Sequence, residues 1–170
     1  MERPASDAQR LRTGSLASAW LSGLRAYLGF VLVGNLTWEV LHLPLYTIWT
    51  TGSGREKAFA VFHCTLGDLL IALSTLAVAL ILAGDPAWPR LRFWPVAILT
   101  IIFGVGYTAF SEWLNVVVRA SWAYSDRMPV IALAGQRFGV SPLGQWIVVP
   151  AAAFAFARWA VEKPAKESLS

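Results

Sequence analysis

Charge and cysteine are both scarce in this chain of 170 residues. Only 14% of the residues are charged, whereas 56% are hydrophobic and the mean hydropathy is +0.55. A soluble globule needs more polar surface than this composition offers, so the chain is predicted to be a membrane protein of one domain. The single cysteine, Cys64, excludes an intrachain disulfide and any cysteine-rich zinc or iron–sulfur site.

Basic residues outnumber acidic ones and give a net charge of +4, but they lie between apolar segments instead of forming one stripe. We therefore expect no nucleic-acid partner. Loops rich in lysine and arginine are retained in the cytoplasm, and the larger group of basic residues includes both ends of the chain. Both termini are thus expected in the cytoplasm. That group consists of Arg3, Arg10, Arg12, Arg25, Arg90, Arg92, Arg158, Lys163 and Lys166.

Four apolar segments are each long enough, at about 1.5 Å per residue, to cross a hydrocarbon core of ~30 Å. They predict an all-α integral membrane fold, an up-and-down bundle of four transmembrane helices within a single domain, residues 26–161. The lipid bilayer is then an obligatory partner. The predicted spans are residues 26–49, 58–83, 94–118 and 143–161, with an outer capping loop at 119–142.

The segment before the first span, residues 1–25, carries four arginines among loosely spaced leucines. We expect it to form a short cytoplasmic helix lying on the membrane surface. The first span does not resemble a cleavable signal peptide, because its apolar run is too long and contains Glu39 and His42. Residues 162–170 are expected to form a cytoplasmic tail.

Five ionisable residues lie inside these apolar segments. Counting about 1.5 Å per residue from the helix ends places all five in the outer, extracytoplasmic half of the bilayer. Burying such a group without a partner is costly, so their shared depth predicts a functional pocket that opens toward that side. The five residues are Glu39, His42, His63, Asp68 and Glu112.

Helical spacing predicts which of these side chains share a face. One stripe of the first span and one of the third can each point into the bundle. On the second span, Cys64 and Asp68 share a face, whereas His63 lies about 140° from Asp68. His63 and Asp68 therefore cannot both point at one ligand. The two stripes are Asn35, Glu39, His42 and Tyr46, and Thr108, Glu112 and Asn115.

One chemistry that fits these residues is metal binding. His42, His63 and Glu112 would provide two imidazoles and one carboxylate, a set that suits iron, or zinc with an open position for water. Glu39-x-x-His42 has the spacing found in di-iron bundles, but the third span has Asn115 where that design requires histidine. Haem held between His42 and His63 is less favoured, because three carboxylates lie nearby.

The same groups also suit metal-free acid/base catalysis on a small or lipophilic substrate. In an enzyme, Glu39, Asp68 and Glu112 would take or relay protons, while Tyr107 and Asn115 would donate hydrogen bonds. The alternative is a non-enzymatic role as a transporter, a proton-path element or an accessory subunit. In such a protein the polar stripes would line the path of a solute or proton, or would pack against the helices of a partner. A homo-oligomer or a larger membrane complex is compatible with either interpretation.

The loop at residues 119–142 is the longest connection and is rich in apolar and aromatic residues. It is predicted to be a lid over the pocket or a surface loop anchored by aromatics, with a turn at 134–139. Five tryptophans near the outer face are interpreted mainly as interface anchors. These are Trp38, Trp49, Trp113, Trp122 and Trp146.

Five motifs lie between residues 30 and 150: Trp38-Glu39-x-x-His42-x-Pro44-Leu45-Tyr46, His63-Cys64-x-x-Gly67-Asp68, Tyr107-x-x-x-Ser111-Glu112-Trp113-Leu114-Asn115, Trp122-Ala123-Tyr124-Ser125 with Met128-Pro129, and Ser141-Pro142-Leu143-x-Gln145-Trp146. Together they resemble a group of small uncharacterised bacterial four-helix membrane proteins. That resemblance implies a bacterial inner-membrane location but does not imply any particular reaction. A much weaker resemblance is to sterol isomerases of the emopamil-binding-protein type. There the histidine precedes the glutamate, whereas here Glu39 precedes His42, so no catalytic residue is carried over.

Overall fold

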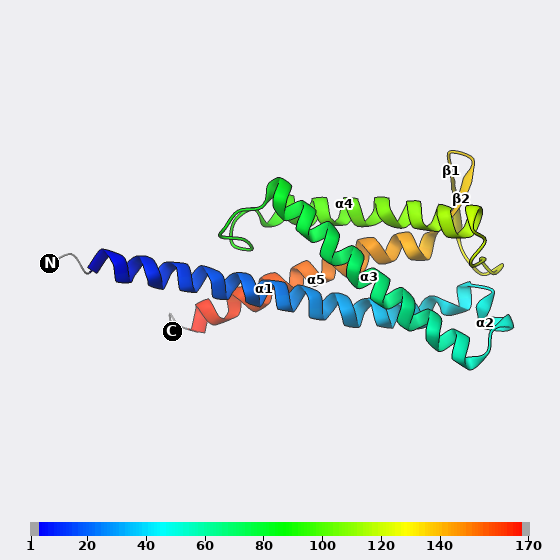
Figure 1. The fold of residues 1–170 in the computed structure, drawn as a ribbon, viewed down its shortest axis with the longest axis horizontal. Coiled ribbons are helices and arrows are strands. Elements are labelled where there is room, and N and C mark those ends of the chain that lie inside the picture. Colours follow the sequence, from blue (N-terminus) through cyan, green and yellow to red (C-terminus); the bar gives the residue numbers. More distant parts are fainter. Residues whose placement is uncertain (1–3, 168–170) are drawn as a thin grey trace.

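The computed structural model describes residues 4–167 as a bundle of four long helices with a small β-hairpin at one end (Figure 1). A 3-10 turn and a short helix follow the first long helix, and a π-helical turn extends the third. The long helices are α1 (Pro4–His42), α3 (Gly54–Ala83), α4 (Phe93–Glu112) and α5 (Val140–Glu167). The shorter elements are the 3-10 turn Leu43–Leu45, α2 (Ile48–Thr51), the π turn Trp113–Val118, β1 (Val130–Leu133) and β2 (Gln136–Gly139).

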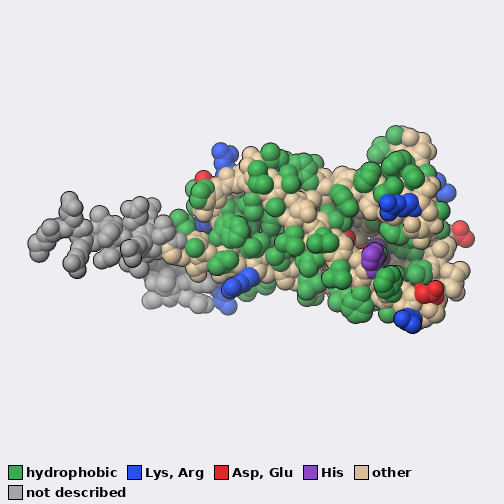
Figure 2. Space-filling view, viewed as in Figure 1, with side chains coloured by type: hydrophobic (Ala, Val, Ile, Leu, Met, Phe, Trp, Pro, Cys, Tyr) green, Lys and Arg blue, Asp and Glu red, His purple; other side chains and the backbone are tan. Residues whose placement is uncertain are grey.

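All four long helices contain a segment long and apolar enough to cross a membrane, which suggests a multi-pass membrane protein, as predicted. Large hydrophobic side chains are exposed along the sides of the bundle, while basic and acidic side chains gather toward its two ends (Figure 2). The candidate spans are Leu16–Leu45, Gly54–Ala83, Phe93–Val118 and Val140–Lys163.

The first helix differs from the prediction. Instead of a separate surface helix before residue 26, α1 runs without a break from Pro4 to His42. No proline lies between Pro4 and Pro44, and most of the intervening residues are good helix formers. Pro44 then ends the helix, because it disfavours helical backbone in the residue before it and has no N–H to donate.

Helix α3 begins earlier than predicted because of a capping box. The Glu56 backbone N–H donates to Ser53 Oγ at 3.3 Å, and the Ser53 N–H donates to the Glu56 carboxylate at 2.8 Å. These reciprocal bonds satisfy backbone donors that the first helical turn leaves free. Helix α5 begins at Val140, three residues before the predicted span, and Pro142 lies in its first turn.

Away from the hairpin, the interior of the bundle is apolar. Tyr27 and Phe154 pack with ring centroids 4.6 Å apart, and Val31, Leu76 and Val96 are almost fully buried around them. Closer to the hairpin, Trp146 of α5 lies against Gly104 of α4. Trp146 is only 2% exposed, so its interpretation as an interface anchor is wrong. The missing side chain of glycine leaves room for the indole, which draws this tryptophan inward.

This close approach makes Gly104 sensitive to substitution. We expect Gly104→Ala to destabilise the protein by about 1–3 kcal/mol, because the new methyl group would overlap the Trp146 ring. Gly106→Ala on the same helix is the matched control, since a Cβ there meets nothing within 4 Å. Reversible unfolding in mixed micelles measures both variants. Equal stabilities for the two would contradict the proposed contact.

The outer loop forms a structure that the sequence analysis missed. Its apolar residues build the antiparallel hairpin β1–β2, with Val130 opposite Gly139 and Leu133 opposite Gln136. The loop is also tied to the segment after α1. Thr47 N–H donates to the Ala123 carbonyl at 3.0 Å, and Ser125 N–H donates to the Leu45 carbonyl at 2.9 Å. The loop thus packs against the hairpin end of the bundle. A capping loop with a turn at 134–139 was predicted there, but the two strands were not.

Candidate functional site

A cluster of polar side chains is buried in the bundle near the hairpin end. Its members come from three helices, α1, α3 and α5, and each is less than a tenth exposed. Asn35, Glu39 and His42 lie on the face of α1 that helical spacing had predicted to point inward. We refer to these residues as the buried polar cluster: Asn35, Glu39, His42, Asp68 and Gln145.

Gln145 joins the three helices. Its Nε2 lies 3.1 Å from Asn35 Oδ1, 3.2 Å from Glu39 Oε1 and 2.9 Å from Asp68 Oδ2. An amide nitrogen has two hydrogens, so three acceptors compete for two donors. One of the three acceptors is therefore left without a hydrogen from this amide.

The cluster continues toward the start of α5 through His42. His42 Nε2 lies 3.1 Å from Glu39 Oε2, and its Nδ1 lies 3.2 Å from Ser141 Oγ. Trp38 Nε1 donates to the same Ser141 oxygen at 3.2 Å. Both nitrogens of the imidazole therefore have partners, which fixes the orientation of the ring beside Glu39.

Glu112, on α4, is buried in a second group of contacts. Its Oε2 accepts a hydrogen bond from the Tyr124 hydroxyl, which in turn accepts one from the Gly139 N–H at 3.0 Å. Burial, and then the bond to Glu112, raise the pKa of Tyr124 above its usual range. The phenol thus stays protonated and is the donor. Through it, the base of the hairpin is connected to a carboxylate in the bundle.

Tyr46 lies between the two groups. Its ring centroid is 5.3 Å from that of His42 and 5.7 Å from that of Tyr124. Burial, followed by the nearby charge of Glu112, raises the pKa of Tyr46 well above its usual value. Glu112 and the buried polar cluster are consequently parts of one site, with aromatic side chains between them.

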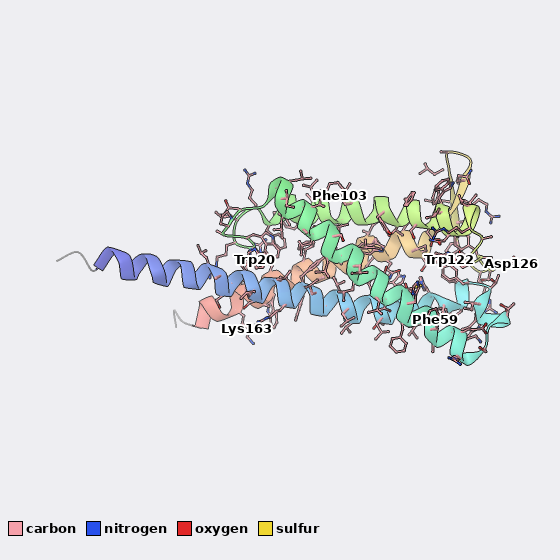
Figure 3. The ribbon with its side chains drawn as sticks, in the orientation of Figure 1. Trp20, Phe59, Phe103, Trp122, Asp126 and Lys163 are labelled. Atoms are coloured by element: carbon pink, nitrogen blue, oxygen red, sulfur yellow. The ribbon has the colours of Figure 1, made fainter. Side chains whose placement is uncertain are left out.

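Four of the five ionisable residues singled out in the sequence thus lie together, and His63 does not. His63 is exposed on the outside of α3, where it stacks on Phe59 at 5.5 Å between centroids. Figure 3 shows Phe59 on the outer side of the same helix. The cause is the helical angle between His63 and Asp68, since only Asp68 can face the interior.

The two predicted hydrogen-bond donors are also outside the cluster. Tyr107 is 50% exposed on α4 and lies away from the bundle interior. Asn115 Nδ2 donates to the Ser111 carbonyl of its own helix at 2.9 Å, in the stretch where α4 becomes a π helix. The chain is wound as a π helix over Trp113–Val118, so the α-helical spacing that grouped Asn115 with Thr108 and Glu112 does not apply there.

The predicted metal ligands are not gathered in this arrangement. Within the described part of the chain, no group of three or more His, Cys, Asp and Glu side chains is placed to hold a metal ion. The set of His42, His63 and Glu112 fails because His63 faces outward, and a bis-histidine haem site fails for the same reason. These residues therefore do not fit the expected zinc, iron or haem.

Two open surface grooves lie at the opposite end of the bundle. One, of about 270 Å³, lies between α1 and the loop that follows α3, and the other, of about 480 Å³, runs beside it along α1. Both are lined in part by Trp20 and Pro86. Figure 3 shows Trp20 at that end and Trp122 at the hairpin end. The grooves are thus separate from the buried polar cluster.

Sequence reasoning included Gln145 in a motif but gave it no role. An amide inside an apolar span was the available signal, because such a group needs hydrogen-bond partners from other helices. Tyr124 and Ser141 carried no comparable signal, since both lie outside the predicted spans. No protein-family model, curated protein or solved structure matches this chain, so its function is inferred from the site alone.

Proposed function

We propose that this protein is a membrane-embedded enzyme that transfers a proton to or from a lipophilic substrate. The observation that carries the proposal is the hydrogen-bonded series from Asp68 through Gln145 and Glu39 to His42. The Glu39 carboxyl and the His42 imidazole are in direct contact and can exchange a proton with each other and with a bound molecule. Such groups inside an apolar span are typical of a functional site.

One proton arrangement satisfies the donors and acceptors along this series. Trp38 N–H donates to Ser141 Oγ, and the Ser141 O–H donates to His42 Nδ1. The proton on His42 then lies on Nε2 and is donated to Glu39 Oε2. With Glu39 ionised and His42 neutral, this pair is ready to accept one proton from a substrate.

The apolar interior favours catalysis over proton conduction. On the side away from the hairpin, the bundle is filled by a layer of Tyr27, Val31, Leu76 and Phe154, and Thr75 and Thr100 donate to carbonyls of their own helices. A proton path across the membrane needs polar groups or water along its whole length. The apolar layer supports a site reached from one face only.

We place that face outside the cytoplasm. The ends of α1 and α5 at residues 4 and 167 lie at the end of the molecule opposite the hairpin (Figure 1). With both of these ends in the cytoplasm, as the distribution of Lys and Arg favours, the buried polar cluster lies in the outer half of the bilayer. A bacterial inner membrane is the proposed location.

The proposal is tested by infrared spectroscopy of the protein in lipid nanodiscs across a pH titration. We expect a protonated-carboxyl band that titrates and that is missing in Glu39→Gln. The band should also change in His42→Gln, because His42 is the hydrogen-bond partner of the Glu39 carboxyl. The matched control is Asp126→Asn, since Asp126 is exposed in the outer loop (Figure 3).

The proposal would be overturned by a Glu39 band whose intensity does not change with pH, or by one that is the same in His42→Gln as in the wild type. Zinc or iron in stoichiometric amount in the purified protein would instead favour the metal-assisted form of the site. A second chain that co-purifies in fixed proportion would favour the accessory-subunit role. Elemental analysis and the mass of the detergent-extracted particle provide these two readouts.

A further inference from the structure

Thr108 differs from the other threonines of the long helices. Four of these donate to the carbonyl one turn earlier, at 2.7–2.8 Å: Thr37, Thr65, Thr75 and Thr100. Thr108 is only 6% exposed, yet its hydroxyl has no hydrogen-bond partner in the described part of the chain. A buried hydroxyl without a partner is costly, so this one is suited to an acceptor that binds there.

A second unpartnered donor belongs to the surroundings of Glu112. Thr108 and Glu112 are one turn apart on the same face of α4. The indole of Trp122 faces the Glu112 carboxyl, but its buried N–H does not reach hydrogen-bond geometry with any described residue. Trp122 and Tyr124 are two residues apart, and both turn toward Glu112. Glu112 thus has one unpartnered donor a helical turn before it and a second one facing its carboxyl group.

The surrounding charges restrict what can bind these donors. Glu112 and Glu39 would repel an anion, and a cation has no lone pair to accept from Thr108 or Trp122. A neutral oxygen avoids both problems. A carbonyl oxygen can accept from both donors, and a hydroxyl can in addition donate to the free oxygen of Glu112.

We propose that Thr108 and Trp122 bind a neutral oxygen, hydroxyl or carbonyl, at the polar end of the lipophilic substrate. This rests on the proposed function and adds the substrate class: a long-chain alcohol, aldehyde or ketone. The apolar remainder of the molecule extends from this oxygen between the helices toward the lipid. The Glu39–His42 pair then acts on carbon atoms near the oxygen.

The test uses photolabelling of the full chain in nanodiscs. The probes are a long-chain primary alcohol with a diazirine and a terminal alkyne, the matching aldehyde, and a hydrocarbon analogue without oxygen. We expect the alcohol or the aldehyde to label peptides around residues 104–124, and the hydrocarbon to label them no more than any other lipid-facing peptide. Equal labelling by all three probes would overturn the proposal.

Variants identify the donors. Thr108→Val removes the hydroxyl at constant shape and should lower labelling about fivefold, as should Trp122→Phe. Thr108→Ser should preserve the labelling. The control is Thr100→Val, a buried threonine of the same helix that donates to the Val96 carbonyl. Unchanged labelling in Thr108→Val and Trp122→Phe would show that these donors serve only water, and would contradict the site.

The labelling and the infrared titration of the wild-type protein together separate this inference from the proposed function. If labelling fails while the Glu39 band titrates normally, the proton-transfer proposal stands and the oxygen site is wrong. If labelling succeeds while the band does not titrate, the chain binds such molecules without acting on them through Glu39.

Discussion

Gln145→Leu is expected to be the most destabilising single substitution in the buried polar cluster. The leucine would remove the one donor that Asn35, Glu39 and Asp68 share, leaving two carboxyl groups without it inside the bundle. Breaking a buried charged network by removing one partner typically costs about 3–5 kcal/mol. The expected result is therefore a variant that unfolds at far lower denaturant, or that folds only at low pH, where both acids are protonated.

Reversible unfolding in mixed micelles measures this loss. Gln136→Leu in the hairpin is the matched control, because Gln136 is only partly buried and lies outside the cluster, and substitutions away from buried networks usually change stability by no more than about 0.5 kcal/mol. At acid pH the difference in unfolding free energy between the two variants should be smaller. A Gln145→Leu protein as stable as the wild type at neutral pH would mean that the carboxyl groups do not depend on this amide.

Tyr124→Phe is expected to release the hairpin from the bundle. The missing hydroxyl would leave the Glu112 carboxylate and the Gly139 N–H without their partner. Each buried group left unsatisfied costs about 1–3 kcal/mol, so the outer loop should open more often. Amide hydrogen exchange at Gly139 is expected to be at least about 10-fold faster, with smaller changes in the inner halves of the helices.

Tyr107→Phe is the control for this experiment. Tyr107 is half exposed on the same helix as Glu112, and its hydroxyl has no hydrogen bond to any described residue. Exchange at Gly139 should be the same as in the wild type. Equal exchange in both variants would show that the Tyr124–Glu112 contact does not hold the loop in place.

These two predictions address different parts of one arrangement. Gln145 holds the helices together around the acidic groups, whereas Tyr124 holds the outer loop against them. A substrate that binds near Glu112 would have to pass this loop or enter between the helices from the lipid. Faster exchange in Tyr124→Phe together with faster photolabelling would favour entry past the loop.

The sequence by itself determined the four apolar helices and the faces of the first one. Helix geometry is local, with a fixed rotation per residue, so the spacing of Asn35, Glu39 and His42 already predicts one inward stripe. The same rule predicts that His63 and Asp68 diverge. Apolar length determines the number of spans in a similar way, since it depends on composition alone.

Only the tertiary structure decided which groups meet. The rotation of each helix about its axis placed Asp68 inside and His63 outside on α3, and brought Trp146 of α5 against Gly104 of α4. The partners of the acids come from distant positions: Gln145 from the last helix and Tyr124 from a loop. Such contacts depend on how whole helices pack, and no local spacing encodes them.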